Sequence, residues 1–199
     1  MHSFVFLAGD VALDFVNTVM VQERTLVDTV SQPAELAAWV AESSLGADYG
    51  VPTSVSRAVH SRAVELRVTL KAGFAALASG EPMSDDALAH LNAVLADDPG
   101  TELVRDDAGA LRRRPRIDLG RDASALPWIL ADAAARVLVD GRAQQLRRCA
   151  NHDTCVLMFL DSSRSRNRRW CSMELCGNRN KVAAHSARAR QSVGDPRTS

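Results

Sequence analysis

The four cysteines of this chain all lie in one short stretch near its C-terminal end, and this clustering limits the fold more than any other sequence feature. The cysteines follow the pattern C-x5-C, fifteen residues, C-x4-C, and none occurs before residue 149. Four thiolates suit tetrahedral zinc, and a site with four protein ligands has no open position for a substrate. We therefore predict one structural Zn²⁺ ion, with these ligands: Cys149, Cys155, Cys171 and Cys176.

Two other interpretations of the cysteine cluster stay open at this point. Four cysteines also bind iron–sulfur clusters, which would make the site a redox sensor. His152 lies inside the first cysteine loop and could replace one thiol as a ligand. Both cysteine pairs are wider than the common C-x2-C, so spacing alone does not separate these alternatives.

The beginning of the chain and its apolar pattern predict a cytoplasmic protein. The first residues, "MHSFVFLAGDVALDF", lack a basic region and contain Asp10 and Asp14, unlike a signal peptide. We find no apolar run near the roughly 18 residues of a membrane span, so we expect no membrane partner. Because cytoplasmic thiols stay reduced, clustered cysteines there favour a metal site over disulfides.

Charge is distributed unevenly along the chain. Residues 1–140 contain 12 Lys/Arg and 20 Asp/Glu, whereas residues 141–199 contain 12 Lys/Arg and 4 Asp/Glu. This asymmetry predicts an acidic body joined to a basic part that attracts polyanions, although the basic part could instead dock on the acidic body or on an acidic protein partner. We predict the following division: an acidic domain over residues 1–141, a basic finger over residues 142–190 and a loose tail over residues 191–199.

Apolar periodicity predicts a mainly helical body with one hairpin. Apolar residues at three- and four-residue steps from Val55 to Leu77 predict a helix over residues 54–79. The segment "TELVRDDAGALRRR" predicts a β-hairpin, and two short strands are expected around the first cysteine pair. Further elements are predicted as follows: a strand over residues 4–7, and helices over residues 11–20 with Asp10 as N-cap, from Pro33, from Ser84 and over residues 124–139.

The fold class that we expect is therefore α+β. A mainly helical N-terminal domain with a small β-hairpin precedes a small treble-clef-like or ribbon-like zinc finger, whose helix begins near the second cysteine pair.

The C-terminal segment "CANHDTCVLMFLDSSRSRNRRWCSMELCGNRNKVAAH" resembles the CGNR zinc-finger family, named for the tetrapeptide at residues 176–179. The similarity runs over residues 146–190 and includes Phe159, Asp161 and the run "RWCSM". The family usually has four residues between its first two cysteines, whereas "ANHDT" provides five here.

The N-terminal body is similar to the ABATE domain, which is described as a stress-induced transcription regulator. The segments "LDFVNT" (residues 13–18) and "QPAELAAW" (residues 32–39) carry this resemblance. Together the two resemblances imply a bacterial regulator whose finger binds duplex DNA and whose body senses a signal or dimerises.

Arginine is frequent in and after the loop "SSRSRNRRW" (residues 162–170). Its forked guanidinium group binds phosphate oxygens or the guanine edge, and a helix fits the major groove. RNA stays open as an alternative partner. We predict the following nucleic-acid contacts: Arg164, Arg166, Arg168, Arg179 and Lys181.

The acidic body contains no pattern that assembles a catalytic site, so we expect no enzyme. The sequence has neither a P-loop nor a G-x-G-x-x-G motif. We interpret Asp14 and Asn17 as members of a buried polar network, with a small-molecule effector pocket as the second interpretation. The sequence leaves a homodimer open.

Overall fold

Helices are the main secondary structure of the computed structural model, which describes residues 4–178. The helices are α1 (Val11–Val16), α2 (Pro33–Glu42), α3 (Ser44–Tyr49), α4 (Arg57–Ala78), α5 (Asp85–Leu95) and α6 (Leu126–Val139). The strands form three separate antiparallel pairs: β1 (Val19–Gln22) with β2 (Thr25–Asp28), β3 (Thr101–Arg105) with β4 (Leu111–Pro115), and β5 (Leu146–Arg148) with β6 (Met158–Leu160). The expected α+β class is confirmed.

Polar side chains cap the N-termini of several helices at the positions that the sequence predicts. The Asp10 carboxylate accepts a hydrogen bond from the Ala12 N–H at 3.0 Å, and the Ser84 hydroxyl accepts one from the Ala87 N–H at 3.3 Å. At α2 the Glu35 carboxylate accepts from the Gln32 N–H at 2.9 Å. These bonds satisfy amide groups that have no partner inside a helix, and so they fix where each helix starts.

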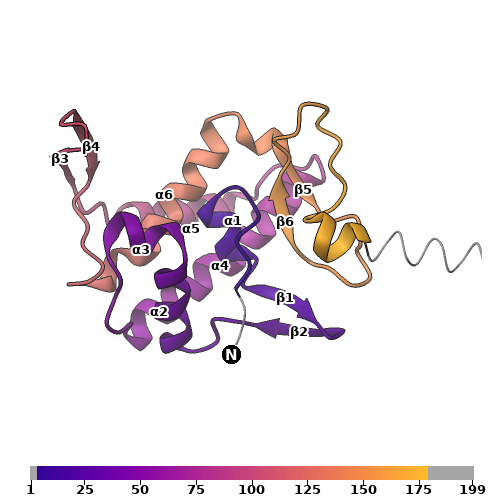
Figure 1. The fold of residues 1–199 in the computed structure, drawn as a ribbon, viewed down its shortest axis with the longest axis horizontal. Helices are drawn as coiled ribbons and strands as arrows, with labels where there is room; N and C mark the ends of the chain where they lie inside the picture. The colour runs from indigo at the N-terminus through magenta and orange to yellow at the C-terminus, as the bar shows by residue number, and fades with distance from the viewer. Residues whose placement is uncertain (1–3, 179–199) are drawn as a thin grey trace, which may run out of the picture.

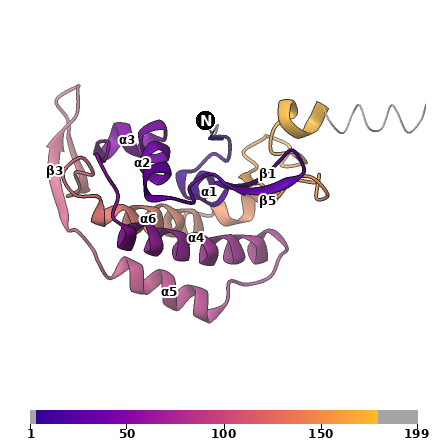
Figure 2. The same ribbon diagram turned by 90° about the horizontal axis from the view of Figure 1, so that it is seen from below.

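The long helix α4 forms the centre of the core. It packs against α1, α5 and α6, and Figure 2 shows α4 lying between α5 and α6. Its buried face carries Leu66, Leu70 and Phe74, which follow the predicted periodicity. Within residues 4–178, no helix is long and apolar enough to cross a bilayer.

The region after α1 differs from the prediction. The predicted helix over residues 11–20 is too long, because α1 ends at Val16 and β1 begins at Val19. The β1–β2 turn consists of Glu23 and Arg24, which both have positive φ angles of 47° and 68°. Hairpin turns of this kind usually contain Asn-Gly or Asp-Gly, so Glu23-Arg24 does not indicate a turn.

The predicted strand over residues 4–7 is wrong, since these residues form no strand. The chain nevertheless joins the finger immediately afterwards. The Ala8 carbonyl accepts a hydrogen bond from the Leu160 N–H of β6 at 2.8 Å. A single bond of this kind fastens the segment without making a strand.

The finger hairpin β5–β6 shares the hydrophobic core of the body. Figure 1 shows β5 and β6 beside α1 and α4, and Phe159 and Cys149 are buried in the same cluster as the apolar residues of α1, α4 and α6. The core therefore continues across Gly141, where the sequence changes from acidic to basic.

The β3–β4 hairpin, which we call the arm, lies at the opposite end of the molecule from the finger (Figure 1). It occupies the place that the sequence predicts and pairs five residues of each strand. Its side chains are mostly exposed to solvent.

Candidate metal centre and the basic loop beside it

The four cysteine sulfur atoms meet at one buried point of the finger. Cys149 follows β5, Cys155 lies in the next loop, and Cys176 lies in a short helical segment, η3 (Met173–Gly177). All four Sγ atoms lie within 4.8 Å of one another, with 3.8 Å from Cys155 to Cys171 and 3.7 Å from Cys171 to Cys176. A tetrahedron with metal–sulfur bonds of about 2.3 Å has edges of about 3.8 Å. The sulfur atoms thus fit the coordination shell of one metal ion.

Main-chain hydrogen bonds place the two cysteine pairs against each other. The Cys149 N–H donates to the Leu157 carbonyl at 3.0 Å, and the Ala150 N–H donates to the Arg169 carbonyl at 2.8 Å. The second of these bonds joins the loop of the first pair to the segment before the second pair. In addition, the Ser172 hydroxyl accepts from amide groups of η3 and fixes the start of that turn.

The electrostatics of the buried thiols favour a bound cation. Hydrogen bonding with Cys149, together with burial, raises the pKa of the Cys155 thiol to about 12. Hydrogen bonding with Cys149 and Cys155, together with burial, raises the pKa of Cys171, whereas hydrogen bonds with Cys155 and Cys171 lower the pKa of Cys149. The protein alone therefore favours the thiolate of Cys149 and disfavours the thiolates of Cys155 and Cys171. A bound divalent ion removes this conflict, because coordinating thiols are deprotonated.

His152 is exposed and does not belong to the group of side chains that surrounds this point. The extra residue in the first cysteine loop is therefore accommodated without bringing the imidazole to the sulfur atoms.

Asp161 holds the basic loop of residues 162–170 on the finger, although it was not predicted as a site residue. Its fully buried carboxylate accepts from the Ser163 N–H at 3.0 Å, the Ser163 hydroxyl at 2.5 Å and the Arg168 N–H at 2.9 Å. Burial alone would raise the pKa of Asp161, but these hydrogen bonds hold the pKa below its ordinary value. The ionised carboxylate thus anchors both ends of the loop.

Arg168 points its guanidinium group at the protein. Its Nε donates to the Trp170 carbonyl at 2.9 Å, and a terminal nitrogen donates to the Cys171 carbonyl. The guanidinium carbon lies 4.3 Å from the centre of the Phe159 ring. In the structure Arg168 positions the main chain at the metal ligand Cys171. A nucleic-acid contact by Arg168 stays a prediction.

The other predicted nucleic-acid residues fall into two groups. Arg164 and Arg166 are exposed on the loop, and Arg166 has a positive φ angle of 48°. Arg179 and Lys181 lie outside the described residues. Next to the loop, a cavity of about 460 Å³ is lined by the following residues: Asn167, Arg168, Arg169, Trp170, Ser172 and Met173.

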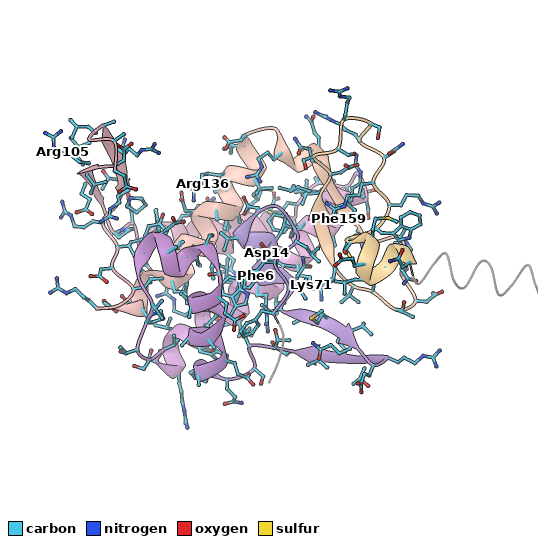
Figure 3. The ribbon with its side chains drawn as sticks, viewed as in Figure 1. Phe6, Asp14, Lys71, Arg105, Arg136 and Phe159 are labelled. Carbon is cyan, nitrogen blue, oxygen red and sulfur yellow. The ribbon has the colours of Figure 1, made fainter. Side chains whose placement is uncertain are left out.

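Asp14 and Asn17 fasten α1 to the segments around it. The Asn17 amide donates to the Met158 carbonyl at 2.8 Å and accepts from the Met158 N–H at 2.9 Å, as a neighbouring strand would. The Asp14 carboxylate accepts from the Leu7 and Ala8 N–H groups, and its burial raises its pKa to about 6. Figure 3 shows Asp14 in the interior, between the helices and the finger. Asn17 forms buried polar contacts and Asp14 forms partly buried ones, and an effector pocket at these two residues stays a prediction.

Comparisons with known proteins match both parts of the chain. Residues 9–141, more than half of the chain, match the ABATE family, whose description is "Putative stress-induced transcription regulator". Residues 145–189 match the CGNR zinc finger family. Both resemblances drawn from the sequence are thereby confirmed. No curated protein matches the chain.

Proposed function

The chain belongs to the ABATE family, and on that premise we propose that it is a transcription regulator that binds duplex DNA through a zinc-bound finger. The observation that carries the proposal is the basic loop of residues 162–170, which is anchored by Asp161 and Arg168 directly beside the cysteine cluster. The proposal places the protein in the cytoplasm, where its DNA target is.

Zinc is the ion that suits the site best. Sulfur–sulfur distances of 3.7 and 3.8 Å suit four thiolates around one ion. In a cluster of several irons each iron takes its own thiolates, which would hold the sulfurs further apart. Zinc would supply no redox chemistry and would close the fold of the finger. The metal-to-protein ratio and the visible spectrum test this: one zinc and no visible absorbance is expected, and a brown, iron-containing protein would contradict it.

The proposed DNA surface consists of exposed cations that form no ion pair with the described residues. Arg164 and Arg166 are exposed, and the described residues provide no acidic ion-pair partner for either side chain. Their guanidinium groups suit phosphate forks and guanine edges. Because Arg168 and Asp161 fix the loop from inside, mutation of the outward arginines would weaken DNA binding without disturbing the metal site.

Selection of bound duplexes from a random DNA pool, with the metal-replete protein at physiological salt, tests the proposal. We expect an enriched motif. The double variant Arg164→Ala/Arg166→Ala should bind more weakly and should lose about 1.8 from the slope of log affinity against log salt, at about 0.9 per phosphate contact. The matched control is Arg57→Ala/Arg121→Ala, which removes two exposed cations outside the loop.

Three results would contradict the proposal: no binding to duplex DNA, binding that does not depend on salt, or an equal loss of affinity in the loop and control variants. Preferential binding to RNA under the same conditions would mean that RNA, and not duplex DNA, is the partner. Binding only to an acidic protein would indicate an interaction module.

A further inference from the structure

An apolar cleft with a cationic end lies on α4 beside the start of β1. Its volume is about 420 Å³, and it is lined by these residues: Val19, Arg67, Val68, Lys71, Ala72 and Ala75. Val68 is 64% exposed, so its apolar side chain is accessible to a ligand in the cleft. Figure 3 shows Lys71 close to the beginning of β1, between the body and the finger. The cleft is of the size at which protein pockets begin to hold small molecules.

Arg67 contributes a buried, ion-paired charge whose hydrogen bonding is incomplete. Its terminal nitrogens bind the Asp28 carboxylate, at 2.7 and 2.5 Å, and one of them also donates to the Thr18 hydroxyl at 2.7 Å. The Arg67 side chain is only 4% exposed, and its buried Nε has no hydrogen-bond partner among the described residues. Asp28 is therefore paired directly with Arg67, and it acts on Lys71 only as a nearby charge, which raises the pKa of Lys71.

Lys71 is the second cation, and it has no acid of its own. Among residues 4–178 it forms neither an ion pair nor a hydrogen bond, although it is partly buried. Burial lowers its pKa, and the positive charges of Arg67 and of Arg148 on β5 lower it further. Two cations, Arg67 and Lys71, thus line the apolar cleft, and only Arg67 forms an ion pair among the described residues. A charge in such surroundings favours an anionic partner.

We propose that this cleft binds an amphipathic organic anion, with its carboxylate or sulfonate group on Lys71 and its apolar part against Val68, Ala72 and Ala75. Neutral or positively charged molecules with the same apolar part should bind more weakly, because they lack a negative group to pair with Lys71. The site does not depend on DNA binding. It does, however, lie on α4, a helix that also packs against β5, the strand that leads into the metal ligand Cys149.

Calorimetric titration of the full-length, metal-replete protein with octanoate, and with octanol as the neutral analogue, tests the site. We expect saturable binding of one octanoate per chain and clearly weaker binding of octanol. Lys71→Met should weaken octanoate binding about tenfold or more, to the level of octanol, because it removes a charged hydrogen-bond donor. Ala72→Trp should weaken both ligands, because the indole occupies the cleft.

Arg57→Met is the matched control, since it removes a cation from an exposed position of the same helix. Its octanoate affinity should stay within about twofold of the wild type. The proposal is overturned if octanoate does not bind at millimolar concentration, if octanol binds equally well, or if Lys71→Met binds octanoate as tightly as the wild type. The comparison of octanoate with octanol on the wild type tests the need for a negative charge even where a variant folds poorly.

Discussion

The arm and the finger hairpin are both antiparallel two-stranded ribbons, but different forces hold them. The arm pairs five residues of β3 with five of β4 and is mostly exposed. The finger hairpin pairs only three residues of each strand, and its strand β6 is wholly buried. The shorter ribbon is therefore the one that is built into the core, so the length of the pairing does not indicate how strongly a hairpin is held.

The arm depends on interactions within its own sequence. The ladder is accompanied by exposed ion pairs, Arg114 with Glu102 at 3.0 Å and Arg112 with Asp106 at 2.6 Å. Pairs of this kind contribute little in water. Leu103 and Leu111 are 70% and 63% exposed, so they add little burial.

The finger hairpin depends on residues that are far away in the chain. Leu160 bonds to Ala8, and Met158 bonds twice to the Asn17 side chain. The cluster of four cysteines holds the hairpin to the rest of the finger. If this comparison is right, changes at the finger should reduce stability strongly, and changes at the arm should not.

Replacement of a metal ligand should have the largest effect. Cys171→Ser removes the ligand whose sulfur lies 3.8 and 3.7 Å from two of the others. We expect the metal-to-protein ratio to fall from about one to near zero and the free energy of unfolding to fall by about 4 kcal/mol or more, since metal binding contributes to folding. Elemental analysis and denaturant unfolding measure both. His152→Ala should keep the metal, and loss of the ion in that variant would make the imidazole a ligand.

Removal of the Asn17 amide should have the next largest effect. Asn17→Ala leaves the buried N–H and C=O groups of Met158 without partners, at about 1–3 kcal/mol each. We expect a total loss of about 3 kcal/mol in denaturant unfolding, together with faster amide exchange in β6. Asn167→Ala, on the exposed loop, is the matched control and should change stability by less than about 0.5 kcal/mol. Equal effects of the two variants would mean that Asn17 does not fasten the finger.

The sequence predicts those features that depend on neighbouring residues. The arm follows from its turn around Asp106 and Gly109, and the helix starts follow from capping residues such as Ser84. The cysteine cluster follows because all four cysteines of the chain lie in one short stretch, at residues 149, 155, 171 and 176. Each of these signals lies within the element that it specifies.

The attachment of the finger could not be predicted, because it depends on contacts between distant segments. Asn17 and Met158 are 141 positions apart, and nothing near either residue indicates the pairing. Likewise, the run of arginines did not reveal that Arg168 turns inward to the Trp170 and Cys171 carbonyls. The β1–β2 turn was missed because Glu23 and Arg24 adopt positive φ angles that the sequence does not suggest.

The pH dependence of stability tests the segment that joins α1 to the finger. Burial raises the pKa of Asp14 to about 6, so folding favours its protonated form. The contribution of Asp14 is thus fully present below its unfolded pKa of about 4 and is lost as the pH rises through 6. Asp14→Asn keeps an oxygen for the Leu7 and Ala8 N–H groups but does not ionise.

We expect the stability of Asp14→Asn to rise relative to the wild type by about 2 kcal/mol between about pH 4 and pH 7. Denaturant unfolding at several pH values measures this difference. Asp107→Asn, in the turn of the arm, is the control for the loss of one negative charge. A difference between Asp14→Asn and the wild type that does not change with pH would mean that the carboxyl group ionises in the folded protein as it does in the unfolded chain.

Changes at the arm should have the smallest effect. Leu103 and Leu111 lie diagonally on one face of the ribbon, and Leu103→Ser/Leu111→Ser removes exposed apolar area without opening a cavity. We expect a change of less than about 0.5 kcal/mol per residue and an unchanged metal content. A loss above about 2 kcal/mol would mean that this face is covered in solution. Sedimentation of the wild type and the variant would then show whether a second copy of the chain covers it, because only in that case does the variant convert a dimer to a monomer.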